Sequence, residues 1–298
     1  MVLAIHEVSA LVPLILKCCG LLNVPFVIVN MALLHPKQTS GFRGYVWRWV
    51  LRRVEQIVSL ASPQLANLEK MYELKRSVLS FTPMPVDAAF FQKAVSIKEE
   101  RFCLAVGTND GKDFETLVSA LPLGERLIVV TDSLNAEKVR RHRCFGAGIE
   151  VYEAMQMAEL RVLYQKAAVL IVPLIESKHG SGHTVFVEGQ ALGKIVIVSG
   201  VTNMTDYVED RINAISVRVG DVASMRRAIE EVLNKPGQFE PMRRAAKALA
   251  KEHFSVRRYG EKLESVIQKA AGDLAKRCSG ENEMGEFKRR KTSDECVS

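Results

Sequence analysis

The segment HGSGHTVFVEGQALGKIVIVSG, residues 179–200, decides the fold class. It passes from glycine and small polar residues into an apolar run that carries one acid, Glu188, and it ends in a second apolar run. The first run, closed by Gly193, predicts a short helix over Thr184–Leu192. The second, rich in valine and isoleucine, predicts a buried strand over Lys194–Ser199. A helix that leads directly into a buried strand is the repeating unit of an α/β protein.

The same alternation extends in both directions from this segment. The expected strands, all short β-branched or apolar runs, are Phe102–Gly107, Arg126–Thr131, Ile149–Tyr152, Val169–Pro173 and, more weakly marked, Ala214–Val219. The expected helices are Phe114–Leu121, Ala136–Arg143, Met157–Ala168, Val222–Asn234, Pro241–Glu252 and Val256–Ala271. Because the strands show no polar alternation, they predict a parallel sheet that is buried on both faces. The arrangement predicts a Rossmann-like, doubly wound domain.

A smaller set of elements precedes this domain. Strands are expected at Val2–Ile5, Pro25–Val29, Gln56–Leu60 and Ser77–Phe81. The stretch TPMPVDAAFF, residues 82–91, contains two prolines and no helical period, which is typical of a domain linker. We therefore expect a short N-terminal domain over 1–84, a complete domain over 85–272 and a disordered polar tail over 273–298.

Composition restricts the classes of partner. The net charge of +7 indicates an anionic partner such as a phosphate, a nucleotide or an acidic lipid, and no nucleic-acid module is recognisable, so no nucleic-acid partner is expected. Six cysteines without a CxxC pair indicate reduced thiols in the cytoplasm and no structural zinc. The apolar region 10–34 is interrupted by prolines and a lysine, so it predicts a helix and a strand rather than a membrane span, which needs about 20 apolar residues.

Two loops at the expected carboxyl ends of strands carry candidate ligand-binding residues. The stretch GTNDGKDFETL, residues 107–117, offers two glycines, Lys112 and a helix start near Asp113, which suits a phosphate. An ordinary turn followed by an Asp cap is the alternative. In the second loop Gly180, Ser181 and Gly182 would admit a ligand close to the backbone.

The helix that follows the second loop offers further candidates. Amides at Gly182, His183 and Thr184 would face a diphosphate at the helix start. Glu188, four residues after Thr184, would face the same crevice and would suit a neutral partner such as ribose hydroxyls. The alternative for Glu188 is a solvated surface glutamate.

Residues 76–272 resemble the C-terminal half of a GT-B glycosyltransferase of the large retaining group called family 4, or glycosyl transferases group 1. Four motifs carry this resemblance in the right order: PMPVDAAFF (83–91), VGTNDGKDFETLVSAL (106–121), YQKAAVLIVPL (164–174), and SGHTVFVEGQALGKIVIVS (181–199) with TDYVED (205–210). The resemblance implies a GT-B-like α/β fold with a complete C-terminal and a partial N-terminal Rossmann-like domain. It also implies retaining transfer of a sugar from a nucleotide-sugar to an acceptor hydroxyl.

The resemblance further implies roles for individual residues. Glu188 matches the second acid of a Glu-x7-Glu signature that binds ribose, and the helix start at Gly182 receives the diphosphate. Lys112 matches the basic residue that neutralises the leaving phosphates, beside Gly107 and Thr108, and Tyr152 lies where the base would sit. The donor is a substrate, so no cofactor is expected. Neither is a metal, because Lys112 and the helix amides would cover the diphosphate and no Asp-x-Asp pair is present.

Two departures from the family pattern concern the donor site. The first acid of the signature should fall at position 180, where this chain has Gly180, and Thr108 replaces a common arginine. The absent acid keeps a second function open, that of a non-catalytic nucleotide-sugar-binding subunit. A sugar-nucleotide epimerase is a third alternative, which the transferase-like linker and the SGHT segment disfavour.

The N-terminal region also departs from the pattern. LAIHEVSALVPLILK (3–17) and VPFVIVNMALLH (24–35) resemble late elements of the acceptor domain, and the earlier strands have no counterpart. We therefore expect a fragment, a start-site truncation, or one half of a split enzyme that needs a partner N-terminal half. His35, with His6 as the second candidate, is the expected acceptor-side histidine.

SGFRGYVWRWVLRRVEQ, residues 40–56, interleaves aromatic residues and arginines on one expected helix. This pattern suits the surface of an anionic membrane, where a lipid-linked or polysaccharide acceptor would be available, at the inner membrane face. The alternative is a helix that packs its aromatic side chains on the first sheet.

Overall fold

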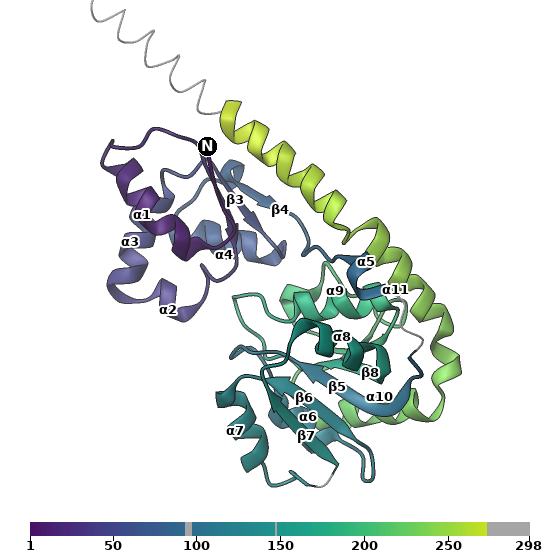
Figure 1. The fold of residues 1–298 in the computed structure, drawn as a ribbon. Coiled ribbons are helices and arrows are strands. Elements are labelled where there is room, and N and C mark those ends of the chain that lie inside the picture. The colour runs from purple at the N-terminus through teal and green to yellow at the C-terminus, as the bar shows by residue number, and fades with distance from the viewer. Residues whose placement is uncertain (93–96, 147, 273–298) are drawn as a thin grey trace, which may run out of the picture. The chain divides into compact units, whose positions relative to one another are not determined.

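The computed structural model describes residues 1–92, 97–146 and 148–272 (Figure 1). The chain divides into two compact units. Of the described residues, the first contains 1–60, 65–82 and 261–272, and the second contains 61–64 and those between 83 and 260. The expected tail over 273–298 lies outside the described residues.

The first unit contains a four-stranded parallel sheet in the order β1-β2-β3-β4. The strands are β1 (Val2–Ala4), β2 (Phe26–Asn30), β3 (Gln56–Ser59) and β4 (Leu79–Phe81), the last preceded by a 3-10 turn over Arg76–Val78. The helices are α1 (Glu7–Cys18), α2 (Pro36–Thr39), α3 (Gly41–Leu51) and α4 (Pro63–Tyr72). Because each new strand is added on the same side, right-handed crossovers place the connecting helices on one face of the sheet.

One apolar cluster joins that face to its helices. It includes Leu14 of α1, Trp47 of α3 and Leu68 of α4, packed against Ile28 and Ile57 of the strands. The apolar region near the N-terminus is therefore a helix and a buried strand, as predicted. Within the described residues, none of the helices combines the length and the apolar character needed to cross a membrane.

The second unit contains a six-stranded parallel sheet in the order β10-β9-β8-β5-β6-β7. Its strands are β5 (Glu100–Val106), β6 (Leu127–Thr131), β7 (Ile149–Glu153), β8 (Ala167–Val172), β9 (Ile195–Ser199) and β10 (Ile215–Val217). The doubly wound parallel sheet predicted from the sequence is confirmed. The expected last strand is shorter than predicted, because only Ile215–Val217 pair with β9 at the sheet edge.

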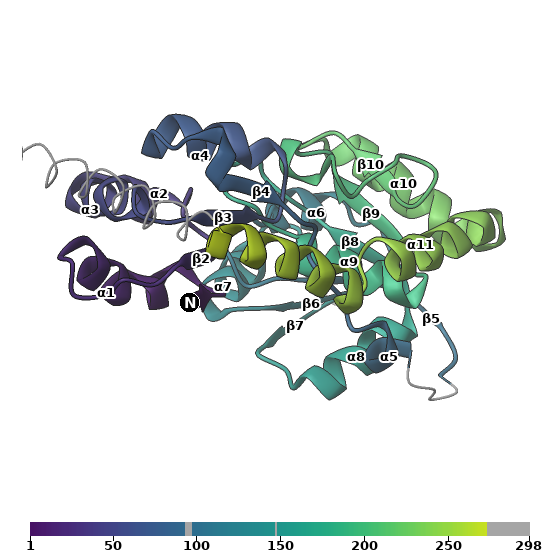
Figure 2. The same ribbon diagram turned by 90° about the horizontal axis from the view of Figure 1, so that it is seen from above.

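Helices cover both faces of this sheet (Figures 1 and 2). One apolar cluster packs α6 (Phe114–Ala120), α7 (Ser133–Arg141) and α10 (Val222–Asn234) on the first face. A second cluster packs α5 (Ala88–Gln92), α8 (Met157–Lys166), α9 (His183–Leu192) and α11 (Glu240–Glu252) on the other. Two 3-10 turns, Thr202–Met204 and Pro236–Phe239, and a helix over 256–272 complete the described residues.

A buried ion pair holds α1 against the strands of the first unit. Lys17 Nζ lies 2.7 Å from Glu55 Oε2, and the same oxygen accepts a hydrogen bond of 2.7 Å from the Phe26 amide. Glu55 is buried and Lys17 nearly so. A carboxylate in such a place depends on its partners, because water does not solvate it.

We expect Lys17→Met to lower the free energy of unfolding of the first unit by about 3–5 kcal/mol, since it leaves the Glu55 carboxylate without its cation. Urea unfolding followed by tryptophan fluorescence measures this, because both tryptophans, Trp47 and Trp49, lie in the first unit.

Arg52→Met is the matched control. Arg52 pairs with Glu73 at 2.7 Å, but both side chains are more than half exposed, so its loss should cost less than about 1 kcal/mol. If both variants lost the same free energy of unfolding, burial would not be what makes the pair of Lys17 and Glu55 important for stability.

Candidate functional site

The second sheet changes its direction of growth between β5 and β8. From β5 the chain adds β6 and β7 on one side, and then returns to add β8, β9 and β10 on the other. Ligands of doubly wound sheets bind at this switch point, beyond the carboxyl ends of the two strands. The loops that follow β5 and β8 are the two loops that contain most of the predicted site residues.

In the first loop the side chain of Lys112 lies across Gly107. A Cβ built on Gly107 would be 2.0 Å from Lys112 Cε, and the φ angle of Gly107 is +156°. The Gly107 carbonyl accepts a hydrogen bond of 2.5 Å from Thr131 Oγ1. Burial lowers the pKa of Lys112 to about 8, and among the described residues no acid pairs with it. The geometry therefore holds a poorly hydrated cation at the switch point.

Short contacts join the two loops. The Asp113 amide donates to the Pro173 carbonyl at 3.1 Å, and the Ile175 amide donates to the Gly111 carbonyl at 3.2 Å. Ser181 Oγ donates to Asn109 Oδ1 at 2.9 Å. A Cβ on Gly111 would be 2.7 Å from Ser181 Cβ. The predicted loops therefore form one continuous structure around Lys112.

The second loop ends at the start of α9. Gly182 is left-handed, with φ +87°, and a Cβ there would be 2.8 Å from Val172 Cγ1, so this position requires glycine on two grounds. The Phe186 amide is the first to donate within the helix, to the Gly182 carbonyl. Within the described residues the amides of His183, Thr184 and Val185 have no partner. Unpaired amides at the positive end of a helix dipole are suited to an anion.

His183 supports this helix start from behind. Its Nε2 lies 2.9 Å from the Asn203 carbonyl, which can only accept, so Nε2 carries the proton. The ring stacks on Tyr207 with centroids 4.6 Å apart. Burial lowers the pKa of His183 to about 4, so the ring is neutral near pH 7. The side chain is a packing element, and only its amide is placed to bind a ligand.

Gly180 lies over the ring of His183. A Cβ on Gly180 would be 2.5 Å from His183 Cε1, so any side chain at position 180 requires the ring to move. A side chain at position 180, where the resemblance would place the first acid of the signature, would therefore crowd this ring. The nearest acid before position 180, Glu176, is exposed, and one of its carboxylate oxygens accepts a hydrogen bond from the Thr202 amide at 3.0 Å.

Glu188 lies inside α9 and is only 7% exposed. The fully buried Tyr164 of α8 donates its hydroxyl to Glu188 Oε2 at 2.6 Å. Burial raises the pKa of Glu188 to about 7, and the hydrogen bond from Tyr164 opposes that rise. The alternative of a solvated surface glutamate is therefore wrong. Near neutral pH the Glu188 carboxyl is therefore partly protonated, and a small change in its surroundings changes the protonated fraction.

Sequence reasoning assigned no role to Tyr164. A signal was available, because Tyr164 follows Leu160 by one helical turn and both lie on the buried side of α8. A buried tyrosine hydroxyl usually has a partner, and that partner is an acid 24 residues away in the chain. Only the packed structure identifies the pair.

Tyr152, Thr108 and His35 lie in different surroundings. Tyr152 is on the edge strand β7 and donates its hydroxyl to Glu150 Oε2 at 3.0 Å. Thr108 is exposed, directly after Gly107. His35 belongs to the first unit, where its Nδ1 accepts the Lys37 amide at the start of α2.

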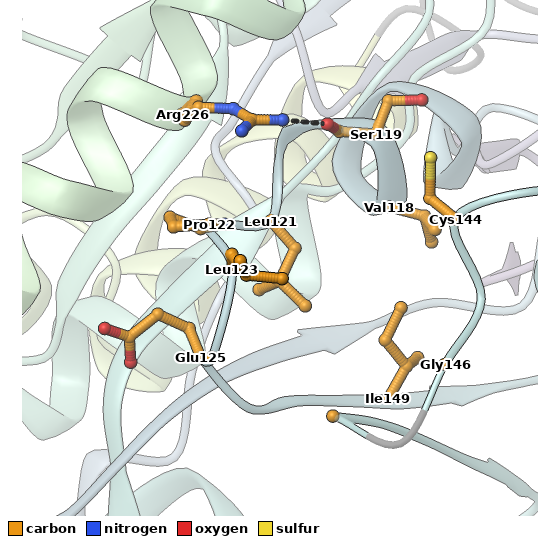
Figure 3. Close-up of a pocket in the computed structure, with 12 residues that line it drawn as sticks. Val118, Ser119, Leu121, Pro122, Leu123, Glu125, Cys144, Gly146, Ile149 and Arg226 are labelled. Carbon is orange, nitrogen blue, oxygen red and sulfur yellow. Dashed lines mark hydrogen bonds between the residues drawn. The ribbon is translucent and has the colours of Figure 1, made fainter.

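The second unit also contains two cavities. The larger, of about 690 Å³, lies before β6 and β7 at the amino ends of the strands and contains none of the predicted site residues (Figure 3). Arg226 and Ser119 at its rim are joined by a hydrogen bond of 2.6 Å. The smaller, of about 240 Å³, is lined by Lys112, Asp113 and Asn135 beside the switch point. The larger hollow is thus not the predicted donor site.

Comparison with known proteins identifies the second unit. Residues 101–235 match the model of a family described as glycosyl transferases group 1. No curated protein matches the chain.

Solved structures resemble the fold of the whole chain. Sucrose-phosphate synthase from Thermosynechococcus elongatus superposes with a TM-score of 0.71 at 18% identity, over 90% of this chain and 72% of its own. Anabaena HepE in complex with UDP gives 0.70 at 14% identity, over 89% and 78%. WaaG, a glycosyltransferase involved in lipopolysaccharide biosynthesis, gives 0.61 at 15% identity, over 90% and 82%.

The family match covers the switch point, the lysine loop and α9, and the structural likeness extends to the first unit. Residues 101–235 are thus similar to the glycosyl transferases group 1 family, and the chain as a whole has the GT-B-like fold that its sequence predicts.

Proposed function

We propose that this chain binds a nucleotide-sugar at the switch point of its second sheet and transfers the sugar to an acceptor hydroxyl with retention of configuration. One observation carries the proposal. Lys112, the unpaired amides at the start of α9 and Glu188 lie on the two loop-and-helix segments that follow β5 and β8. Anabaena HepE, similar in fold, has been solved with UDP and with UDP-glucose, which supports a nucleoside diphosphate sugar as the donor.

Each group has a distinct part in this proposal. The amides of His183, Thr184 and Val185 hold the diphosphate, and Glu188 accepts hydrogen bonds from the ribose hydroxyls. The bond between the anomeric carbon and the diphosphate oxygen breaks, and the acceptor oxygen bonds to the same face of the sugar. The acceptor proton passes to the departing diphosphate. Lys112 stabilises the charge that develops there, which is the step that a buried cation accelerates most.

No metal is part of this proposal, because Lys112 and the helix amides supply the positive charge that the diphosphate needs. The acceptor is proposed to be lipid-linked or a polysaccharide, with His35 as the acceptor-side group. We propose the cytoplasmic side of the membrane as the place of action.

A second function has one specific observation in its favour. The first acid of the family signature is absent, and Gly180 packs directly on His183, so the site does not offer a second carboxylate beside the transferred sugar. This supports a subunit that binds the nucleotide-sugar without turnover. Both functions require donor binding, and turnover separates them.

Calorimetric titration of UDP-, GDP- and ADP-sugars tests donor binding. We expect one of the three to bind and Glu188→Ala to weaken its affinity by about 1.5–3 kcal/mol, because the ribose hydroxyls lose a charged acceptor. Glu230→Ala, which removes an exposed acid on α10, is the matched control and should bind as the parent does. Unchanged affinity in Glu188→Ala would refute the ribose assignment.

Donor affinity should depend on pH in a bell shape. Glu188 ionises as the pH rises through about 7, which strengthens its acceptance of hydroxyl protons. Lys112 loses its charge as the pH rises through about 8, which weakens diphosphate binding. The affinity measured by titration at a series of pH values should therefore rise, reach a maximum between these two values and fall.

Three variants show which residue produces each side of this bell-shaped curve. In Glu188→Gln the rise of affinity on the acid side (the acid limb) should be absent, and in Lys112→Met the fall on the alkaline side should be absent. Tyr164→Phe removes a hydrogen bond that lowers the pKa of Glu188, so its acid limb should move to higher pH. An acid limb that stays in place in Tyr164→Phe would show that Tyr164 does not act on Glu188.

Gly180→Glu restores the missing acid but crowds His183. We expect the single variant to lose about 1–3 kcal/mol of stability through overpacking, measured by thermal unfolding. Gly180→Glu with His183→Gly removes the obstructing ring and should recover part of that stability. Donor hydrolysis or transfer that appears only in the double variant would favour the non-catalytic function for the natural chain. Turnover by the natural chain, alone or with a partner N-terminal half, would exclude it.

A further inference from the structure

The outer side of α1 carries an apolar stripe. Val8, Val12 and Leu16, spaced by one helical turn, are all exposed, and Val12 is 66% exposed. Ala10 and Leu14 on the opposite side are buried in the core of the first unit. A helix of a soluble unit normally presents polar residues to water, so this stripe is the reverse of the usual pattern.

The outer side of α3 carries aromatic residues. Phe42, Tyr45 and Trp49 follow one another at helical spacing and are 80%, 68% and 44% exposed. Trp47, in contrast, is buried, and its Nε1 donates to Gln38 Oε1 at 2.9 Å. The expectation that the aromatics of this helix pack on the sheet thus holds for Trp47 only.

The two stripes belong to neighbouring helices. α1 and α3 contact each other, both cover the same side of the first sheet, and both views show them at one end of this unit (Figures 1 and 2). We call their outer side the α1–α3 face: Val8, Val12 and Leu16 of α1 with Phe42, Tyr45 and Trp49 of α3. Apolar groups in such number rarely face water together without a binding role.

Within residues 1–60, which contain α1 and α3, the exposed charged side chains have one sign, and the exposed acid beside them is Glu73 of the following segment, which pairs with Arg48 and Arg52. Residues 1–60 contain two acids, Glu7 and Glu55, and both are buried. The exposed charged side chains of this stretch are cationic: Lys37, Arg43, Arg48, Arg52 and Arg53. Arg52 pairs with Glu73, outside this stretch, whereas Arg43 and Arg53 have no acidic partner among the described residues. A second copy of this chain on the same face would bring arginines against arginines, which opposes self-association.

We propose that the α1–α3 face binds the surface of an anionic lipid bilayer. The apolar and aromatic side chains enter the boundary between headgroups and acyl chains, and the arginines contact the lipid phosphates. Tyrosine and tryptophan are favoured at that depth, because one end of each ring is apolar and the other is polar. The proposal rests on the first unit alone and does not depend on the donor site.

Tryptophan fluorescence tests the proposal directly, because the chain contains only Trp47 and Trp49. Vesicles of equal parts phosphatidylcholine and phosphatidylglycerol should shift the emission to shorter wavelength, and phosphatidylcholine vesicles should not. Trp49→Phe leaves the buried Trp47 as the sole reporter, so this variant should co-sediment with the anionic vesicles but show no shift. An equal shift in both proteins, or none in the parent, would overturn the orientation proposed.

Co-sedimentation of the full chain with the same vesicles measures the contributions of the two kinds of residue. Arg43→Gln with Arg53→Gln should weaken binding by about tenfold or more, with a smaller salt dependence. Phe42→Ser, Tyr45→Ser and Trp49→Ser together should weaken it by at least about tenfold. Leu123→Ser with Leu134→Ser, which changes exposed leucines of the second unit, is the matched control and should bind as the parent does.

Two further measurements distinguish a loss of lipid binding from misfolding and from dimer formation. Donor titration should be the same in parent and variants, so a loss of vesicle binding with intact donor binding shows a folded protein and supports the proposal. Sedimentation equilibrium without lipid should show that the α1–α3 face does not mediate dimers. Dimers that the aromatic variant abolishes, or vesicle binding that persists in both the arginine and the aromatic variants, would overturn it.

Discussion

The contact between Lys112 and Gly107 is the constraint on which the proposed donor site depends. The lysine stem occupies the space that a Cβ at position 107 would need, so the glycine admits the stem and the stem carries the ammonium over the end of β5. The same loop is held to the segment after β8 through Gly111, Asp113 and Ser181. Because two of these contacts are backbone hydrogen bonds and the third joins the side chains of Ser181 and Asn109, they leave little freedom for the cation at the switch point.

Burial then sets the chemistry of the ionisable groups around this contact. It lowers the pKa of Lys112 to about 8 and that of His183 to about 4, and it raises that of Glu188 to about 7. A bound diphosphate would favour the charged lysine and add hydrogen bonds at the unpaired amides. Such a site is poorly solvated before the ligand arrives, which strengthens its electrostatic interactions with an anion.

The two units differ in the kind of surface that they present. In the second unit, both faces of the sheet are covered, and the ligand-binding groups lie at the ends of its strands. In the first unit, the outer sides of α1 and α3 leave large apolar and aromatic side chains in water beside unpaired arginines. Burial of these side chains in an apolar phase is what the proposed binding to a lipid surface would supply.

The sequence by itself determined the alternation of strands and helices, the parallel doubly wound sheet and the two loops of the switch point. These follow from local periodicity and from glycine positions, which are properties of neighbouring residues. Only the tertiary structure decided that Tyr164 meets Glu188, that Gly180 lies against the His183 ring, and that Trp47 is buried whereas Trp49 is exposed. Those facts depend on which side chains from distant segments occupy the same space, and spacing along the chain does not encode that.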